Sequence, residues 1–147
     1  MCPAHRFNHC DRCCSQIKIE TAKSVHAVHE AYEWADIGVV PLLPNRHVSG
    51  LTVVLESVTA GKPVIATDTR GLKGYFSDSE VYYVPARKVE ALAIAIKECA
   101  EKADETFSRI QNAQTRLLTD ELTVKGFALR HVRLTEDLLQ SELDGTR

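Results

Sequence analysis

Two kinds of hydrophobic pattern alternate along the chain after residue 16. Short, mostly apolar runs are typical of strands covered on both faces of a parallel sheet. Such runs occupy residues 37–43, 63–67 and 81–84, and a weaker alternating run occupies residues 17–20. Apolar positions at helical spacing occupy residues 24–35, 51–60, 88–102, 104–118 and 124–143, with one further helical turn at 72–76. This alternation predicts an α/β fold, a parallel sheet flanked by helices with additional C-terminal helices.

Helical spacing also predicts which side chains are buried. One apolar face of the helix at 88–102 consists of Val89, Leu92, Ile96 and Cys99. An apolar stripe on the last helix consists of Phe127, His131, Leu134 and Leu138. We therefore expect His131 to be packed in the interior rather than catalytic. Trp34 is expected to pack in the core or between elements, whereas His26 and His29 are expected at or near the surface.

The polar loop at residues 45–50 lies between a predicted strand and a predicted helix. In doubly wound α/β folds, ligands bind beyond the carboxyl ends of the strands, where the chain turns into a helix. Ser49 and Gly50 stand at the start of this helix, and glycine allows a ligand to approach the backbone closely. The free N–H groups of Leu51 and Thr52, the helix dipole and the hydroxyls of Ser49 and Thr52 suit a diphosphate.

Glu56 follows Thr52 by one turn on the same helix face, about 6 Å further along the axis. A carboxylate at this place can accept hydrogen bonds from the vicinal hydroxyls of a ribose. The two features together fit a nucleoside diphosphate. The same residues also fit an ordinary helix N-terminus followed by a solvated or ion-paired glutamate, so both interpretations remain open at this point.

The segment from Ser49 to Thr67 resembles the donor-site motif of the retaining GT-B glycosyltransferases of group 1 (family 4). Those enzymes carry a pattern similar to Glu-Gly-x-Gly-x-x-x-x-Glu-Ala-Met-Ala-x-Gly-Lys-Pro-Val-Ile-Ala-Thr, and a subset has Ser-Gly-x-Thr in its front half. Here Glu56 takes the place of the second glutamate, and Ala60 to Pro63 that of the following turn. Weaker similarity on both sides extends the resemblance over residues 17–143.

The resemblance implies an incomplete Rossmann-like domain, the C-terminal half of a GT-B enzyme, over residues 16–147, preceded by a leader or tail at residues 1–15. It implies a nucleoside diphosphate (NDP) sugar as the donor substrate, and no cofactor or metal. Glu56 would hold the ribose hydroxyls, and the diphosphate or the donor sugar would be contacted by Ser49, Gly50, Leu51 and Thr52. His47 could add a contact, and Thr67 and Asp68 could line the cleft.

The chain departs from the family pattern in two places. By spacing, the first glutamate of the paired motif falls on Val48, which cannot hydrogen-bond a sugar. The acceptor-binding N-terminal domain and a basic Arg…Lys pair have no counterpart before Gln16. We therefore expect no catalysis by this chain alone and predict that a separate chain supplies the N-terminal GT-B domain. The alternatives are an inactive remnant that self-associates as an interaction module, and a relative of the sugar-nucleotide epimerases.

The amino-acid composition limits the binding partners and the cellular compartment that we expect for this protein. A chain of 147 residues fits one domain, and a net charge of −2 predicts no general affinity for nucleic acid. No apolar run approaches the roughly 20 residues of a membrane span, so we expect a cytoplasmic protein, free or peripheral to a membrane. Four of the five cysteines lie within the first 14 residues, beside His5 and His9. This arrangement is a poor disulfide framework, and a zinc site there is the less favoured alternative.

Overall fold

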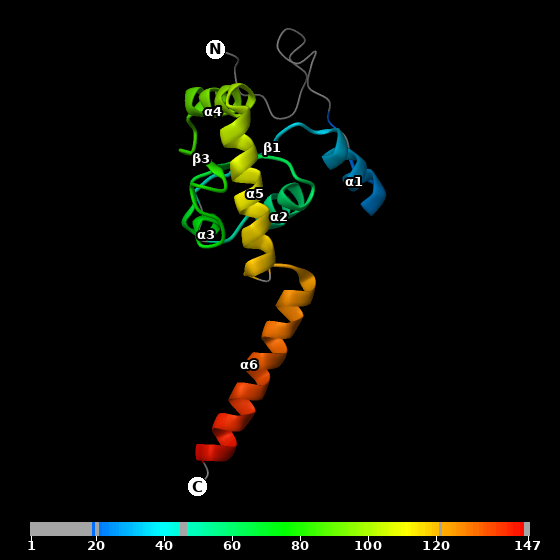
Figure 1. The fold of residues 1–147 in the computed structure, drawn as a ribbon, viewed down its shortest axis with the longest axis vertical. Helices are drawn as coiled ribbons and strands as arrows, with labels where there is room; N and C mark the ends of the chain where they lie inside the picture. Colours follow the sequence, from blue (N-terminus) through cyan, green and yellow to red (C-terminus); the bar gives the residue numbers. More distant parts are fainter. Residues whose placement is uncertain (1–18, 20, 45–46, 121, 146–147) are drawn as a thin grey trace.

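A computed structural model of the chain describes residues 19, 21–44, 47–120 and 122–145 (Figure 1). Its centre is a three-stranded parallel sheet in the order β1 (Gly38–Val40), β2 (Val64–Thr67) and β3 (Tyr82–Val84). Val39 pairs with Ile65, and Ile65 pairs in turn with Tyr82. All four residues of the central strand are buried. The prediction of an α/β domain with a parallel sheet between helices is therefore confirmed.

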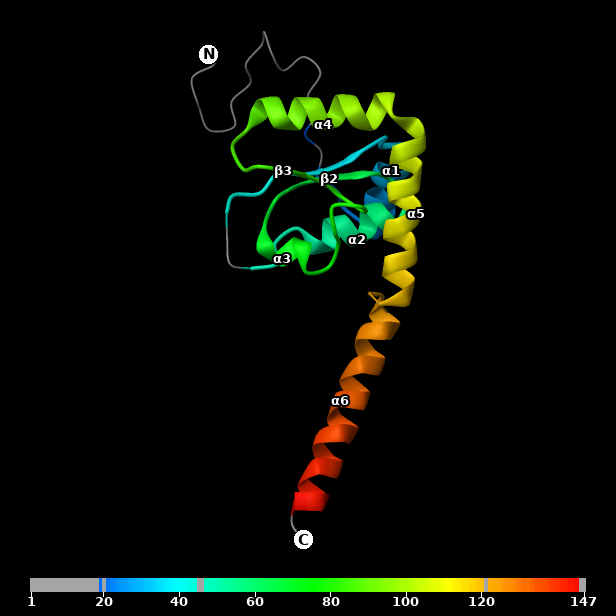
Figure 2. The same ribbon diagram turned by 60° about the vertical axis from the view of Figure 1, so that its left-hand side comes forward.

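Helices cover the sheet on both faces (Figure 2). The helices of the described residues are α1 (Val25–Trp34), α2 (Leu51–Thr59), α3 (Arg70–Lys73), α4 (Val89–Glu101), α5 (Ala103–Thr119) and α6 (Val124–Gly145). The core between α2 and the sheet includes Val54, Val58 and Phe76, and a second core between α4 and the sheet includes Ile65 and Cys99. Strand β2 contributes to both cores because alternate side chains of a strand point to opposite faces.

Local signals in the sequence set the helix ends. The Oγ atom of Ser24 accepts a hydrogen bond of 3.2 Å from the backbone N–H of Ala27, which is the N-cap that the sequence predicts. Helix α2 begins after Gly50 and is followed by Ala60 and Gly61, where φ is +69°. A glycine takes this left-handed conformation without strain, so Gly61 ends the helix as predicted.

Helix α2 packs closely on the first strand because both carry small residues at the contact. A Cβ atom added to Gly38 would lie 2.5 Å from the Oγ atom of Ser57, which is closer than atoms can approach. Ser57 is fully buried, and its hydroxyl donates a 2.8 Å hydrogen bond to the carbonyl of Val53 one turn earlier. A glycine facing a satisfied serine therefore fixes the distance between helix and sheet.

Several predictions of burial are wrong. Trp34 is 89% exposed, and on α4 the side chain of Val89 is 74% exposed while Ala95 is buried. Val39 is 38% exposed, so the first apolar run is a half-covered edge strand. His131 and the rest of its stripe are exposed because α6 extends away from the body of the domain. The predicted strand at residues 17–20 lies outside the described residues, except for Ile19, which is exposed and in no strand.

Candidate functional site

The loop before α2 leaves the first turn of that helix open. Gly50 is the N-cap residue, with φ of +77° and no side-chain capping bond. The first backbone bond into the helix runs from the N–H of Val54 to the carbonyl of Gly50, over 3.0 Å. The N–H groups of Leu51 and Thr52 come before this bond, and they carry the positive end of the helix dipole.

Glycine at position 50 has a structural cause beyond its backbone angle. A Cβ atom there would lie 2.5 Å from the Cγ1 atom of Val40 and 3.3 Å from the Cδ1 atom of Leu42. The missing side chain therefore makes room for the end of β1, whereas the sequence suggested room for a ligand. The first turn of α2 is held against the carboxyl end of that strand as a result.

Glu56 already has one hydrogen-bond partner within the chain. Its Oε2 atom accepts a bond of 2.8 Å from the hydroxyl of Tyr32, which links α1 to α2. Burial, followed by this hydrogen bond, raises the pKa of Tyr32 to about 12. A carboxylate can accept about four hydrogen bonds, so one phenol leaves capacity for the hydroxyl groups of a ligand. The side chain of Glu56 is exposed and can be reached from solvent.

A cavity of about 810 Å³ lies between α1, α2 and the start of α6. Three of the six predicted site residues, Leu51, Thr52 and Glu56, line it together with Tyr32 and Arg130. The predicted common face of Thr52 and Glu56 is therefore present in the structure. Ser49, Gly50 and His47 do not line this cavity, and the side chain of His47 is exposed on the preceding loop.

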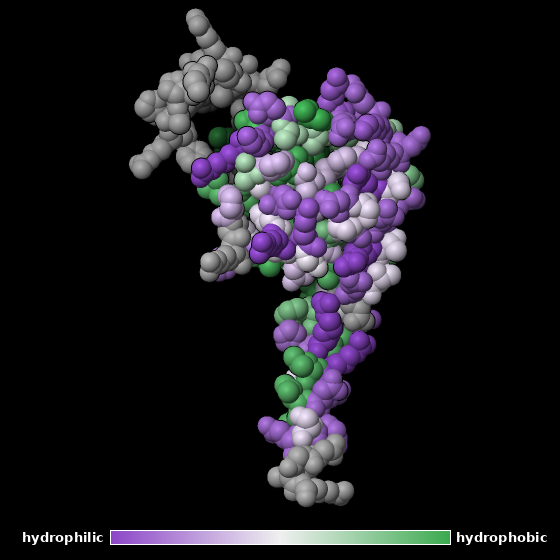
Figure 3. Space-filling view, turned by 90° about the vertical axis from the view of Figure 1, so that its left-hand side faces the viewer, coloured by the Kyte–Doolittle hydropathy of each residue, from purple (hydrophilic) through white to green (hydrophobic). Residues whose placement is uncertain are grey.

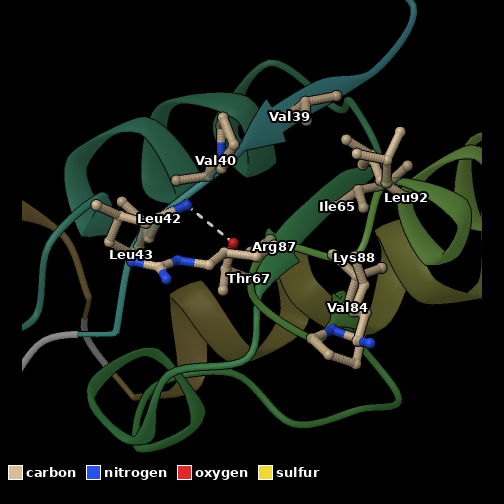
Figure 4. Close-up of a pocket in the computed structure, with 14 residues that line it drawn as sticks. Val39, Val40, Leu42, Leu43, Ile65, Thr67, Val84, Arg87, Lys88 and Leu92 are labelled. Carbon is tan, nitrogen blue, oxygen red and sulfur yellow. Dashed lines mark hydrogen bonds between the residues drawn. The ribbon is translucent and has the colours of Figure 1, made fainter. Parts of the chain in front are cut away.

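A second cavity of about 260 Å³ lies at the carboxyl ends of all three strands (Figure 4). Thr67 lines it and accepts a 2.8 Å hydrogen bond from the N–H of Leu42, which ties the ends of β1 and β2 together. Asp68 does not line it. The carboxylate of Asp68 pairs instead with the ammonium group of Lys73 at 3.1 Å, and its contact with Lys73 helps to raise the pKa of that lysine.

Two cations at the rim of this smaller cavity were not among the predicted site residues. Arg87 and Lys88 follow β3 and its proline, and Figure 4 shows the Arg87 side chain beside Thr67 and Leu43. Arg87 has φ of +61°, a left-handed backbone that is unfavourable for a residue with a side chain. Within the described residues neither cation has an ion-pair partner. The signal available in the sequence was the pair of adjacent basic residues that follows the strand and its proline.

These features define a Rossmann-like α/β domain with a candidate ligand site at the carboxyl edge of its sheet. The chain matches the family model of Glycosyl transferases group 1 over residues 5–102, well over half of its length. The protein therefore belongs to the group 1 glycosyltransferases, and the resemblance inferred from Ser49 to Thr67 is confirmed. No curated protein matches the chain.

The residues that the structure describes bear on two further kinds of site. In this part of the chain no three His, Cys, Asp or Glu side chains are grouped so that they could hold a metal ion. The histidines and cysteines of residues 1–15 lie outside it. None of the helices described is both long and apolar enough to cross a bilayer.

Proposed function

We propose that this domain binds the nucleotide-sugar donor of a glycosyl transfer reaction. The observation that carries the proposal is the arrangement on α2. Leu51 and Thr52 of the uncapped first turn and Glu56 one turn later line the same cavity. Family membership supports glycosyl transfer in general, and these two features match the two polar parts of a nucleoside diphosphate.

Each group has a distinct role in this proposal. The first-turn N–H groups of α2 hold the diphosphate, together with the hydroxyl of Thr52. Glu56 accepts hydrogen bonds from the ribose, and Tyr32 holds its carboxylate in place by the bond to Oε2. Arg87 and Lys88 line the separate, smaller cavity at the strand ends, and their positive potential attracts an anionic ligand to the domain.

Sugar transfer breaks the bond between the anomeric carbon and the diphosphate, so negative charge develops on the leaving group. Cations and N–H dipoles fixed in advance stabilise such charge. This chain supplies these groups on one side of the donor, and we propose that a separate chain with an N-terminal GT-B domain supplies the acceptor side. The remnant hypothesis remains the competing proposal, and it is favoured by Val48 at the position of the first glutamate.

Calorimetric titration with UDP-, GDP- and ADP-sugars tests donor binding. We expect saturable binding of one nucleotide class, weakened about tenfold or more by Glu56→Gln. The substitution keeps an oxygen for the Tyr32 hydroxyl but removes the charge, and a hydrogen bond to a charged group contributes about 1.5–3 kcal/mol.

Glu136→Gln provides the matched control, because this exposed glutamate lies on α6 away from the cavity. It should leave the affinity unchanged. A folded sample that gives no heat of binding and no thermal shift with any donor at millimolar concentration would contradict the proposed function.

A further inference from the structure

The last helix has an apolar stripe that nothing in the described structure covers. Helix α6 has 22 residues, about 33 Å in length, and it points away from the body of the domain (Figure 1). Figure 3 shows apolar side chains gathered along one side of this helix. Phe127 is 57% exposed, Leu134 57% and Leu138 58%.

The spacing of this stripe is that of a coiled-coil seam. The stripe residues are separated alternately by three and four positions, at Val124, Phe127, His131, Leu134 and Leu138. An alternation of three and four residues keeps one seam facing a partner helix, here over two heptads. Within the stripe, the rings of Phe127 and His131 lie 4.2 Å apart between centroids, so these two seam positions are in contact along the helix.

Charges on α6 are separated along its length. The first half carries the basic residues Lys125, Arg130 and Arg133, and the second half carries the acidic residues Glu136, Asp137 and Glu142. This order opposes the helix dipole, which favours acidic residues in the first turn and basic residues in the last. The first turn of α6 has no acidic residue and the last turn no basic one. An antiparallel partner of the same sequence would offset this unfavourable order.

We propose that α6 forms an antiparallel coiled coil with α6 of a second copy of this chain. Antiparallel pairing places the basic half of each helix beside the acidic half of the other, whereas parallel pairing places like charges together. In the antiparallel register, Arg130 of one copy faces Asp137 of the other, twice by symmetry. One nitrogen of Arg130 donates to the carbonyl of Asp120 at 2.9 Å, and the guanidinium has further donors for a carboxylate.

Val124, Phe127 and Arg130 also line the larger cavity of the proposed donor site, so the two proposals share a boundary and are tested by separate measurements, oligomeric state and calorimetry. The coiled-coil proposal rests on α6 alone, whereas the donor proposal rests on α2 and the strand ends. A separate N-terminal domain is the other occupant that an apolar helix face could accept. Nothing requires such a partner to complement the basic first half and the acidic second half of α6. A second copy in antiparallel orientation complements both halves, because it carries the same charges in reverse order.

Sedimentation equilibrium of the full chain tests the inference. We expect a dimer at about 100 µM, where a complex with micromolar affinity is almost fully formed. The double variant Leu134→Asn with Leu138→Asn should be monomeric and should keep the circular dichroism of the folded domain. Leu129→Asn is the matched control, because Leu129 is 39% exposed on the opposite side of α6. This control should remain dimeric.

Charge reversal tests the direction of pairing. Arg130→Asp should weaken the dimer about tenfold or more, and Arg130→Asp combined with Asp137→Arg should restore it. Restoration supports the antiparallel register, since a parallel pair would not bring these two positions together. A folded monomer at about 100 µM, or a dimer that survives the double asparagine variant, would overturn the inference. So would a failure of the charge swap to restore the dimer.

Discussion

Gly50, beside the end of β1, and Arg87, after β3, both have a left-handed backbone, and only one of them is glycine. Gly50, with φ of +77°, takes this conformation freely, and its missing side chain accommodates Val40. Arg87, with φ of +61°, takes it against the preference of its Cβ atom, at a penalty of roughly 1–2 kcal/mol. Strain of this kind concentrates at functional sites. The position of Arg87 at a cavity rim therefore marks it for testing.

The substitution Arg87→Gly should affect the stability of the fold and the affinity for the donor in different directions. We expect the free energy of unfolding to stay the same or to rise by up to about 1 kcal/mol, because glycine relieves the left-handed strain. Affinity for the donor should fall severalfold, because a cation at the strand ends is lost. Urea titration and calorimetry measure the two effects.

Lys97→Ala serves as the control, because this exposed cation lies on α4 and does not line the cavity. It should change the affinity little. An Arg87→Gly variant that binds the donor as tightly as the native chain would exclude a role for Arg87 in donor binding.

Part of the candidate site could be predicted from sequence spacing alone. Thr52 and Glu56 are four positions apart, so any α-helix brings them to one face. Arg87 could not be placed in this way, because it reaches the same sheet edge only through the pairing of β3 with β2. Tyr32 was missed for a similar reason, since its bond to Glu56 joins residues 24 positions apart in different helices.

At the scale of elements, the contact between β1 and α2 depends on Gly38 and Ser57. Gly38→Ala should lower the free energy of unfolding by about 2–3 kcal/mol, because the added methyl group would overlap the Oγ atom of Ser57. The penalty should be smaller in a Ser57→Ala background, where that atom is absent. Urea unfolding of the two single variants and the double variant measures the coupling.

We expect a coupling of at least about 0.5 kcal/mol between the two sites. Gly74→Ala is a matched control, because φ at Gly74 is −69° and the nearest heavy atom to an added Cβ is 3.4 Å away. Strictly additive effects of the Gly38 and Ser57 substitutions would show that the added methyl group does not clash with Ser57, because α2 shifts away from β1.

The helices were predictable because their signals are local. Ser24 caps α1 and Gly61 follows α2, and both signals can be read from a few neighbouring residues. Burial was less predictable, because it depends on whether another element covers a face. The periodicity of α6 is the same whether its stripe is covered or not. On α4, Val89 and Cys99 share one helical face, yet Val89 is exposed while Cys99 is buried in the core.

At the scale of the whole molecule, two tyrosines predict a loss of stability in alkali. Burial raises the pKa of Tyr83 above its ordinary value of 10.0, and the pKa of Tyr32 is raised to about 12. Both phenols stay neutral in the folded chain while they ionise in the unfolded chain. The stability that these two neutral phenols give to the folded state is thus complete below about pH 10. It declines as the pH rises from there through the pKa values of the folded state.

Urea titrations between about pH 9 and pH 11 measure this decline. Tyr83→Phe should make the decline shallower, although it also removes the hydrogen bond of 2.9 Å from the Tyr83 hydroxyl to the carbonyl of Phe76. The native stability near neutral pH should therefore be lower in the variant, and the two curves should converge in alkali. Parallel curves would contradict the assignment to Tyr83.

The order of the strands in the sheet also bears on how the chain folds. Because β1, β2 and β3 are neighbours in the sequence as well as in the sheet, each strand pairs with the one before it after a single crossover. Pairings between segments close in sequence lose less chain entropy and form faster than distant ones. The sheet can therefore assemble in the direction of synthesis, and β2 has its first partner before β3 leaves the ribosome.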